Sequence, residues 1–494
     1  MSLHVELSPE AIQRLHAQRR NSTITSLVIA GFSLVLLALL LGMLLLPPPP
    51  KDPIVIHYIP EPPTKPPVPS PKQTPINTAN RPSAPPPAAA PVLVANTFSP
   101  VAISTPDVDV PAPSLDFGSG NDFGSDWLRG DESGSQFDTI PPVMKKRCSK
   151  EDRLARLQES GGNEACEDAV VKALDWFKAT QSADGSWTQR NQTAMTGLAL
   201  LAYLGRCETP RSLNYGDTVS RAMTYLIDIG LKNDGKLSAN PTGNSWPYEH
   251  AIATYALAEA ATFCKEGNIP VPDLFEVTQK AGQWIIDNQN HNGGWAYAYA
   301  TSGGHTDLSV AAWQIQALKA CHHTGLEFKG LPRAANKAMD YVDSLQSKDG
   351  GFGYSKAGET HATGYFTLTG AGLLSLQMWN KGEGTSARRA ANYITKNTKF
   401  EYEGIYSDLY GHYYEAQAIM NRGGKAWSDY NAIFRDQLLK NQNADGSWKV
   451  PNSQGGGKIR AVAPQFTSNA HYRTALCTLM LEVYYRFLPG TSSK

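Results

Sequence analysis

The 494-residue chain carries 45 basic and 45 acidic side chains, so its formal net charge is zero. A chain with this balance lacks the electrostatic footprint of nucleic-acid binding, and we therefore exclude DNA and RNA as partners. Hydrophobic residues make up 41% of the sequence, which is enough for a large core once the polar stretches are set aside.

The first hydrophobic element is a run of 23 residues that begins at Ile24, ends at Leu46 and contains no charged side chain. A helix of this length crosses about 30 Å of hydrocarbon, so we predict one transmembrane helix that holds the protein in the lipid bilayer. Three arginines precede the run, whereas one lysine and one aspartate follow it and cancel. The positive-inside rule then places residues 1–23 in the cytoplasm and the rest in the periplasm or another extracytoplasmic space, which predicts an inner (cytoplasmic) membrane protein. A cleaved signal peptide is the alternative, but the run is too long for one and no A-x-A cleavage motif follows.

Residues 47–144 form the predicted arm. Of the 34 prolines in the chain, 22 lie between Pro47 and Pro113. Proline fixes φ and lacks an N–H, so these roughly 67 residues favour polyproline II and, at about 3.1 Å each, reach on the order of 200 Å. Residues 116–138 are rich in glycine, serine and acidic side chains, a composition typical of disorder. We expect the whole arm to be a disordered spacer.

An anchor helix followed by a proline-rich arm resembles the front half of a TonB-type energy transducer, over about residues 10–130. The resemblance implies an ExbB/ExbD-type membrane complex as a partner. Two features depart from that family. The hydrophobic run has no histidine, and the C-terminal part is not a small mixed α/β module. A plain spacer therefore stays open as the alternative.

Internal repeats dominate the chain after residue 165. Four segments share the pattern Q-x-x-x-G-x-aromatic, and two degenerate copies lie around Gly235 and Gly404. The full copies begin at Gln181, Gln289, Gln346 and Gln442 and end at Trp187, Trp295, Phe352 and Trp448. A glutamine amide at a helix end can bond the backbone groups that the terminus leaves unpaired, and glycine lets the chain reverse. The pattern therefore predicts six turns.

Two kinds of helix flank these turns. Before five of them, a basic residue is followed by alanine and, three positions later, by an aromatic residue, which is a helical spacing. These copies begin at Lys172, Arg221, Lys280, Lys337 and Arg389. The helices after the turns are richer in Ala, Gly, Leu and Thr, which permits close inner packing, and we expect them to start near Thr193, Glu249, Thr306, His361, Asp408 and Thr467. Six helix–turn–helix units predict an all-α (α/α)6 toroid over residues 145–490, because ring closure removes the need for the polar caps of a solenoid.

The Q-x-x-x-G-x-W repeats, over residues 165–487, resemble those of the squalene cyclase and protein prenyltransferase β-subunit superfamily, whose fold is an (α/α)6 toroid. The segments TDLSVAAWQIQALKA and DLYGHYYEAQAIMNRGGKAW resemble bacterial prenyltransferase and squalene oxidase repeat proteins. Terpenoid cyclases of this superfamily take their strong acid from a D-x-D-D or D-C-T-A-type motif, and residues 140–494 contain neither. Asp307, at the start of the third inner helix, is the nearest relic. The C-G-E-Q motif of thioester proteins that share the toroid is also absent.

Prenyltransferases of this superfamily bind zinc through aspartate, cysteine and histidine. The resemblance implies that Asp307 and His361 occupy the aspartate and histidine positions, but Ser309 stands where the cysteine would be. Serine is a poor zinc ligand, so we predict neither a metal site nor a cofactor, and Asp307 and His361 remain the candidate catalytic residues. The opening turns of other inner helices also carry histidines, which would form a metal site with His361 if they met at one rim. These are His250, His412 and His471. We expect them to be hydrogen-bonded rim residues.

Aromatic and polar residues gather around the turns and the inner-helix starts. Aromatic rings offer apolar area with a polar handle, which suits a lipid, a glycan or a peptide, although rings of this kind also brace helix pairs. The candidate ligand-binding residues are Trp246, Tyr248, His250, Trp295, Tyr297, Asp307, Tyr354, His361, Tyr410 and His412.

The positions of the cysteines bear on two questions, whether a disulfide can form and how the core is packed. Cys148 and Cys166 are close enough in sequence to pair in an oxidising compartment. Cys207, Cys264 and Cys321 are spaced 57 residues apart, each near the end of an inner helix, where we expect small apolar packing.

These patterns predict a membrane-anchored protein of the cell envelope whose toroid binds a ligand or partner rather than catalysing a reaction. Three alternatives stay open. The first is an enzyme of the terpenoid cyclase or prenyltransferase type, and the second is a TonB-like component of envelope energy transduction. The third is a glycan-active enzyme with two facing carboxylates, for which the acids near inner-helix starts are candidates. These acids are Glu249, Asp307, Glu359 and Asp408.

Overall fold

The computed structural model describes residues 147–486 except for 189, 360–367, 454–456 and 462–463. The predicted cytoplasmic segment, anchor helix and arm lie outside the described residues, and so does His361. Within the part of the chain that is described, none of the helices combines the length and the apolar character that a membrane crossing needs.

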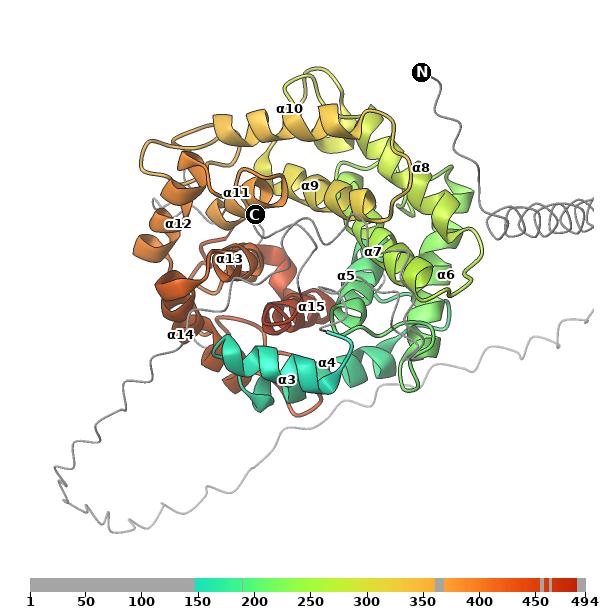
Figure 1. Ribbon diagram of the computed structural model, residues 1–494, viewed down its shortest axis with the longest axis horizontal. Coiled ribbons are helices and arrows are strands. Elements are labelled where there is room, and N and C mark those ends of the chain that lie inside the picture. Colours follow the sequence, from blue (N-terminus) through green and yellow to red (C-terminus); the bar gives the residue numbers. More distant parts are fainter. Residues whose placement is uncertain (1–146, 189, 360–367, 454–456, 462–463, 487–494) are drawn as a thin grey trace, which may run out of the picture. The chain divides into compact units, whose positions relative to one another are not determined.

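Outer and inner helices alternate along the chain and form a closed double ring (Figure 1). The outer helices are α4 (Glu164–Thr180), α6 (Gly216–Lys232), α8 (Leu274–Asp287), α10 (Leu331–Ser344), α12 (Thr385–Asn397) and α14 (Gly424–Lys440). The inner helices are α5 (Gln192–Gly205), α7 (Trp246–Glu266), α9 (Leu308–His323), α11 (Thr369–Met378), α13 (Leu409–Arg422) and α15 (Ala470–Leu481). The remaining elements are α3 (Lys150–Glu159), which packs on α4, and the short 3-10 helices η2 (Tyr297–Tyr299) and η3 (Pro464–Ser468). In these residues β-structure is limited to isolated bridges, and the predicted all-α toroid is confirmed.

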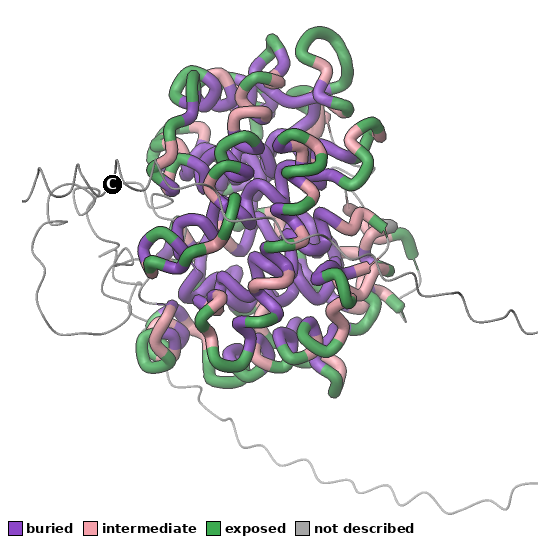
Figure 2. The backbone as a smooth tube through the Cα atoms, turned by 90° about the vertical axis from the view of Figure 1, so that its right-hand side faces the viewer, coloured by how far each residue is buried: buried purple, intermediate pink, exposed green. Residues whose placement is uncertain are grey.

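The two layers differ in how their residues are buried. In α9 every residue from Leu308 to Cys321 is buried, and α5 is buried throughout from Thr193 onward. In α10, by contrast, burial follows the helical period, with Leu331, Ala334, Ala335 and Ala338 buried and Pro332, Arg333, Asn336 and Asp340 exposed. Figure 2 shows the same contrast, with buried tube in the interior and exposed tube at the outer surface. The small residues of the inner helices therefore face protein on all sides.

The motif glutamines join each turn to the next outer helix. Gln181 Nε2 donates to the carbonyl of Gly185 in its own turn, at 2.9 Å, and to that of Thr218 in α6, at 3.0 Å. Gln289 and Gln346 make the equivalent pair of bonds, to α10 and α12 respectively. The glutamine amide thus bonds backbone groups as predicted, but these belong to the turn and to the next outer helix and not to the end of its own helix.

The last motif closes the ring onto the first outer helix. Gln442 Nε2 donates to Gly446 O at 3.0 Å and to Ala169 O of α4 at 2.8 Å, across 273 positions of sequence. Gly446 has φ +94°, and a Cβ there would lie 2.1 Å from the carbonyl oxygen of Lys172. Lys172 begins the basic–alanine–aromatic pattern of α4, so the two sequence patterns meet in space. A side chain at the motif glycine would separate the turn from the next helix.

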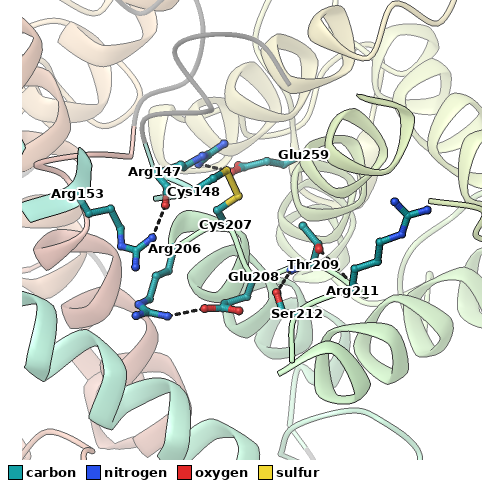
Figure 3. Close-up of a disulfide and its surroundings, with 10 residues drawn as sticks. All are labelled: Arg147, Cys148, Arg153, Arg206, Cys207, Glu208, Thr209, Arg211, Ser212 and Glu259. Carbon is teal, nitrogen blue, oxygen red and sulfur yellow. Dashed lines mark hydrogen bonds and ion pairs between the residues drawn. A yellow bond between two sulfur atoms is a disulfide. The ribbon is translucent and has the colours of Figure 1, made fainter. Parts of the chain in front are cut away.

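A disulfide fixes the chain where it enters the ring (Figure 3). It joins Cys148 to Cys207 at the end of α5, with a Cα–Cα distance of 4.9 Å. The predicted pairing of Cys148 with Cys166 is therefore wrong, as is the expectation that Cys207 only fills space. Cys166 lies on the buried face of α4 as a free thiol that donates to Asn163 Oδ1. The equivalent Cys264 and Cys321 are buried and free, as expected.

Candidate functional site

A pocket of about 260 Å³ opens among the N-terminal turns of the inner helices α5, α7, α9, α13 and α15. Most of its wall is apolar. Ala194, Met195, Ile252, Trp313, Phe466 and Tyr472 form this part. One side is polar, with hydroxyl and carboxyl groups from five segments of the chain. Tyr248, Glu249, Tyr297, Ser309, Tyr354 and Tyr410 form that side.

The polar side is a continuous chain of hydroxyl groups. Tyr354 Oη lies 2.9 Å from Tyr297 Oη, which lies 3.2 Å from Tyr248 Oη. Tyr248 Oη is 2.7 Å from Ser309 Oγ, and the Ser309 hydroxyl donates to Asp307 Oδ1 at 2.6 Å. Residues that are far apart in sequence thus meet at one carboxylate.

Asp307 is the N-cap of α9 and is completely buried. Besides the Ser309 hydroxyl, its Oδ1 accepts the backbone N–H of Val310 at 2.9 Å, which stabilises the carboxylate together with the positive end of the helix dipole. Its Oδ2 accepts no hydrogen bond from the described residues, and the nearest described base is His305, with Nε2 at 3.7 Å. Asp307, a candidate catalytic residue from the sequence, thus caps the start of α9.

Burial and the nearby charge of Asp307 keep the tyrosines protonated. Burial is the largest cause, and the carboxylate is the second, of the raised pKa of Tyr248, Tyr297 and Tyr354. The three phenols therefore act as neutral hydrogen-bonding groups and not as bases.

The ring is filled deeper along its axis. Trp313 stacks on Tyr413 with ring centroids 5.2 Å apart, and Gln316 bonds the hydroxyl groups of Tyr413 and Tyr414 at 3.1 Å each. The pocket is consequently a recess at one end of the toroid.

The structure brings half of the predicted binding residues together. Tyr248, Tyr297, Tyr354 and Tyr410 line the pocket, and Asp307 lies directly behind its polar side. Trp246 and Trp295 lie elsewhere: Trp246 packs against Tyr299, and Trp295 Nε1 donates to Ile285 O of α8 at 2.9 Å.

The predicted histidines bridge the inner and outer layers. His250 accepts the backbone N–H of Leu237 at 2.9 Å and donates to Ala281 O of α8 at 3.1 Å, and burial lowers its pKa to about 3. His412 accepts from the hydroxyl of Tyr430 at 2.8 Å and donates to Lys399 O at 3.1 Å, and burial lowers its pKa to about 4. Both rings have each nitrogen bonded, which leaves neither for a metal. Among the described residues there is no group of three or more potential metal-binding side chains.

Of the four candidate carboxylates, some adjoin the pocket and the others lie elsewhere. Glu249 lines the pocket, accepts from Ser238 Oγ at 2.7 Å and has its pKa raised by burial. Glu359 bonds the backbone N–H groups of its own turn, and Asp408 caps α13 by accepting from Gly411 N at 3.1 Å. Only Glu249 and Asp307 of the four adjoin the pocket.

Sequence reasoning missed several lining residues, of which Trp313 is the largest. It lies four positions after Ser309 on α9, and residues with this spacing share a helix face. The helical spacing of four positions from Ser309 was the signal that could have found it.

No protein-family model matches the chain, and no curated protein matches it. Among solved structures it is similar to an α-1,6-mannanase from Salegentibacter in complex with α-1,6-mannotriose, with a TM-score of 0.46, 9% identity, and coverage of 65% of this chain and 99% of the other. It is also similar to a type II terpene cyclase from Scytonema in complex with geranylgeranyl dihydroxybenzoate, with a TM-score of 0.41, 14% identity, and coverage of 68% and 99%. We transfer no residue role and no substrate from matches this distant.

Proposed function

We propose that this chain is a membrane-tethered binding protein whose toroid holds a small amphipathic ligand outside the cytoplasm. The observation that carries the proposal is the pocket, in which an apolar wall faces one continuous hydroxyl chain. A hydrocarbon body would be buried against Met195, Ile252 and Trp313, and a single polar group would meet the tyrosines. Burial of each CH₂ group contributes about 0.8 kcal/mol to binding.

The carboxyl groups favour binding over catalysis. Asp307 lies behind Ser309, and its Oδ1 already accepts two hydrogen bonds. Glycoside hydrolysis needs two carboxyl groups that both face the substrate, and of this pair only Glu249 lines the pocket. The presence of one lining acid keeps a glycan-active enzyme as the second candidate.

The disulfide supports the extracytoplasmic position. Structural disulfides persist in oxidising compartments, and Cys148 follows directly on the predicted arm. This agrees with the orientation that the arginines before Ile24 predict. The membrane anchor and an ExbB/ExbD-type partner stay predictions, for which co-purification before and after exchange of the anchor sequence is the test.

Equilibrium dialysis tests the binding function directly. The full-length protein in phosphatidylcholine nanodiscs is dialysed against radiolabelled decanol or α-1,6-mannotriose, with empty nanodiscs as the partition control. We expect saturable binding of decanol at one site per chain. Ala194→Phe, which places a ring in the pocket wall, should weaken it at least about tenfold.

Two results would contradict the proposal. One is decanol uptake equal to that of empty nanodiscs, and the other is uptake unaffected by Ala194→Phe. Saturable binding of the mannotriose alone would favour the glycan-active alternative. The melting temperature of the variant shows whether its fold is retained.

A further inference from the structure

The proton of each hydroxyl in the chain that leads to Asp307 can be placed, because a hydroxyl has a single proton to donate. Ser309 donates its proton to Asp307, so the 2.7 Å bond between Ser309 and Tyr248 requires Tyr248 to be the donor. With that proton used, Tyr248 can only accept from Tyr297 at 3.2 Å. Tyr297 in turn accepts from Tyr354 at 2.9 Å. All four bonds therefore point toward the Asp307 carboxylate.

A fifth hydroxyl at the pocket follows the same rule. Tyr410 donates to the backbone carbonyl of Ser309 at 2.8 Å. The oxygens of Tyr248, Tyr297 and Tyr410 thus meet the pocket with lone pairs, while their protons are engaged with protein groups. A ligand group that approaches these oxygens has to donate a hydrogen bond.

The described residues that line the pocket include an acidic side chain but no lysine or arginine. The acidic side chain is Glu249, and Asp307 lies behind the pocket wall. In either protonation state Glu249 adds no positive charge. Asp307 Oδ2 is buried and accepts no hydrogen bond from the described residues. A buried carboxylate is stabilised by a cation that shares its surroundings, and the only described base within ion-pair distance is His305, which is half exposed at the rim.

The aromatic walls favour a cation as well. The rings of Tyr248 and Tyr297 lie with centroids 6.0 Å apart and are tilted by 56°, and Trp313 and Tyr410 lie across the same recess. The face of an aromatic ring attracts a cation within about 6 Å of its centroid. Aromatic rings and hydroxyl lone pairs thus line one small volume.

From these observations we infer that the pocket selects a ligand with a positively charged hydrogen-bond donor, an alkylammonium group, and rejects anionic head groups. The inference rests on the proposed binding function and names the class of its ligand. The ammonium N–H groups would donate to the tyrosine oxygens, the Asp307 carboxylate would balance the charge through the hydroxyl chain, and the alkyl body would lie against the apolar wall.

Three ligands with the same chain length test this selection by equilibrium dialysis: decylammonium, decanol and decanoate. Full-length protein in phosphatidylcholine nanodiscs is compared with empty nanodiscs for each ligand. We expect decylammonium to bind about tenfold more tightly than decanol, since hydrogen bonds from a charged donor are roughly twice as strong as neutral ones. Decanoate should bind at least about a hundredfold more weakly than decylammonium, because its carboxylate finds no lysine or arginine among the described lining residues and meets the lone pairs of Tyr248, Tyr297 and Tyr410, with donors only from side chains such as Asn191 and Ser245.

Asp307→Asn assigns the selectivity to the buried carboxylate. It should reduce the affinity for decylammonium about tenfold and change that for decanol less than about threefold. Asp408→Asn is the matched control, since Asp408 is also a buried N-cap of an inner helix, accepts a backbone N–H at 3.1 Å and does not line the pocket. This control should keep the wild-type order of the three ligands.

The outcomes separate the inference from the function on which it rests. Decanoate binding as tight as decylammonium overturns the inference and leaves the binding function intact. Failure of all three ligands to saturate overturns both. Full retention of the decylammonium preference in a folded Asp307→Asn protein overturns the role of Asp307. The comparison of the three ligands on the wild-type protein decides the matter even if that variant does not fold.

Discussion

Replacing Gln442 by alanine tests whether the ring is closed in solution. Its side-chain amide donates to Gly446 O at 3.0 Å and to Ala169 O at 2.8 Å, which joins the last turn to the first outer helix. Gln289 makes the same two bonds inside the ring, to Gly293 O at 2.8 Å and to Ala334 O at 2.9 Å. In an open superhelix the Gln442 bond to α4 would be absent, whereas that of Gln289 to α10 would persist.

The expected effect follows from these bonds. Each contributes about 1 kcal/mol, so loss of both costs about 2 kcal/mol in the free energy of unfolding. Unfolding entropy of about 2.1 cal/mol/K per residue gives about 0.7 kcal/mol/K for the roughly 330 described residues. The melting temperature should therefore fall by about 3 °C for Gln442→Ala, and by about as much for Gln289→Ala.

Differential scanning calorimetry of the full-length protein measures this shift. Gln158→Ala, at an exposed position of α3, is the control for loss of a surface glutamine and should leave the melting temperature unchanged within about 1 °C. The closed ring is refuted if Gln442→Ala lowers the melting temperature by only about half as much as Gln289→Ala or less, because an open chain would keep only the Gln442 bond to Gly446 O.

Two other perturbations test the disulfide and the buried histidines. Cys207→Ser should lower the free energy of unfolding by about 4 kcal/mol, because the disulfide spans a sequence separation of 59 residues. Non-reducing peptide mapping of the wild-type protein should recover Cys148 linked to Cys207. A peptide that links Cys148 to Cys166 would contradict the structure. The pKa of His250 is lowered from 6.5 to about 3 by burial, so its contribution to stability is complete above pH 6.5 and declines as the pH falls toward 3, because the unfolded chain takes up the proton first. His250→Gln should lower the free energy of unfolding by about 2–3 kcal/mol at pH 8, because two hydrogen bonds are lost, and by about 2 kcal/mol less than that at pH 5. Urea unfolding at the two pH values measures this difference. A loss of stability that does not change with pH would disprove the assignment.

The fold was predictable because its signals act through the backbone. The motif glutamine bonds two carbonyl groups, and the motif glycine adopts a positive φ against the next helix, so neither depends on the identity of neighbouring side chains. Four full copies of one pattern, with the two degenerate copies around Gly235 and Gly404, then give the number and order of helix pairs. The pairing of Cys148 could not be read in this way, because it depends on where the entering segment crosses the end of α5.

Half of the candidate site residues were predicted correctly. Whether a candidate lines the pocket or not has a geometric cause. Tyr248 and His250 are two positions apart on α7, as are Tyr410 and His412 on α13. At 3.6 residues per turn, two positions correspond to about 200°, so when the tyrosines face the pocket the histidines face the outer layer. Position along a helix was predicted well, and the face was not. Because inner helices such as α9 are buried on every side, hydrophobic periodicity gives no indication of which face lines the pocket.

The buried acids at the two ends of the ring have different partners, and this difference bears on the ligand. At the end where the inner helices finish, Glu259 is paired with Arg147 at 2.8 Å and with Arg486 at 3.0 Å, both supplied by segments that flank the repeats. Glu482 lies at the same end, and burial raises its pKa well above the usual range. Asp307 at the pocket end caps α9 and accepts two hydrogen bonds, and no arginine or lysine occurs among the described residues that line the pocket. A buried acid whose nearest described base is a half-exposed histidine at 3.7 Å is the feature that a cationic ligand would complete.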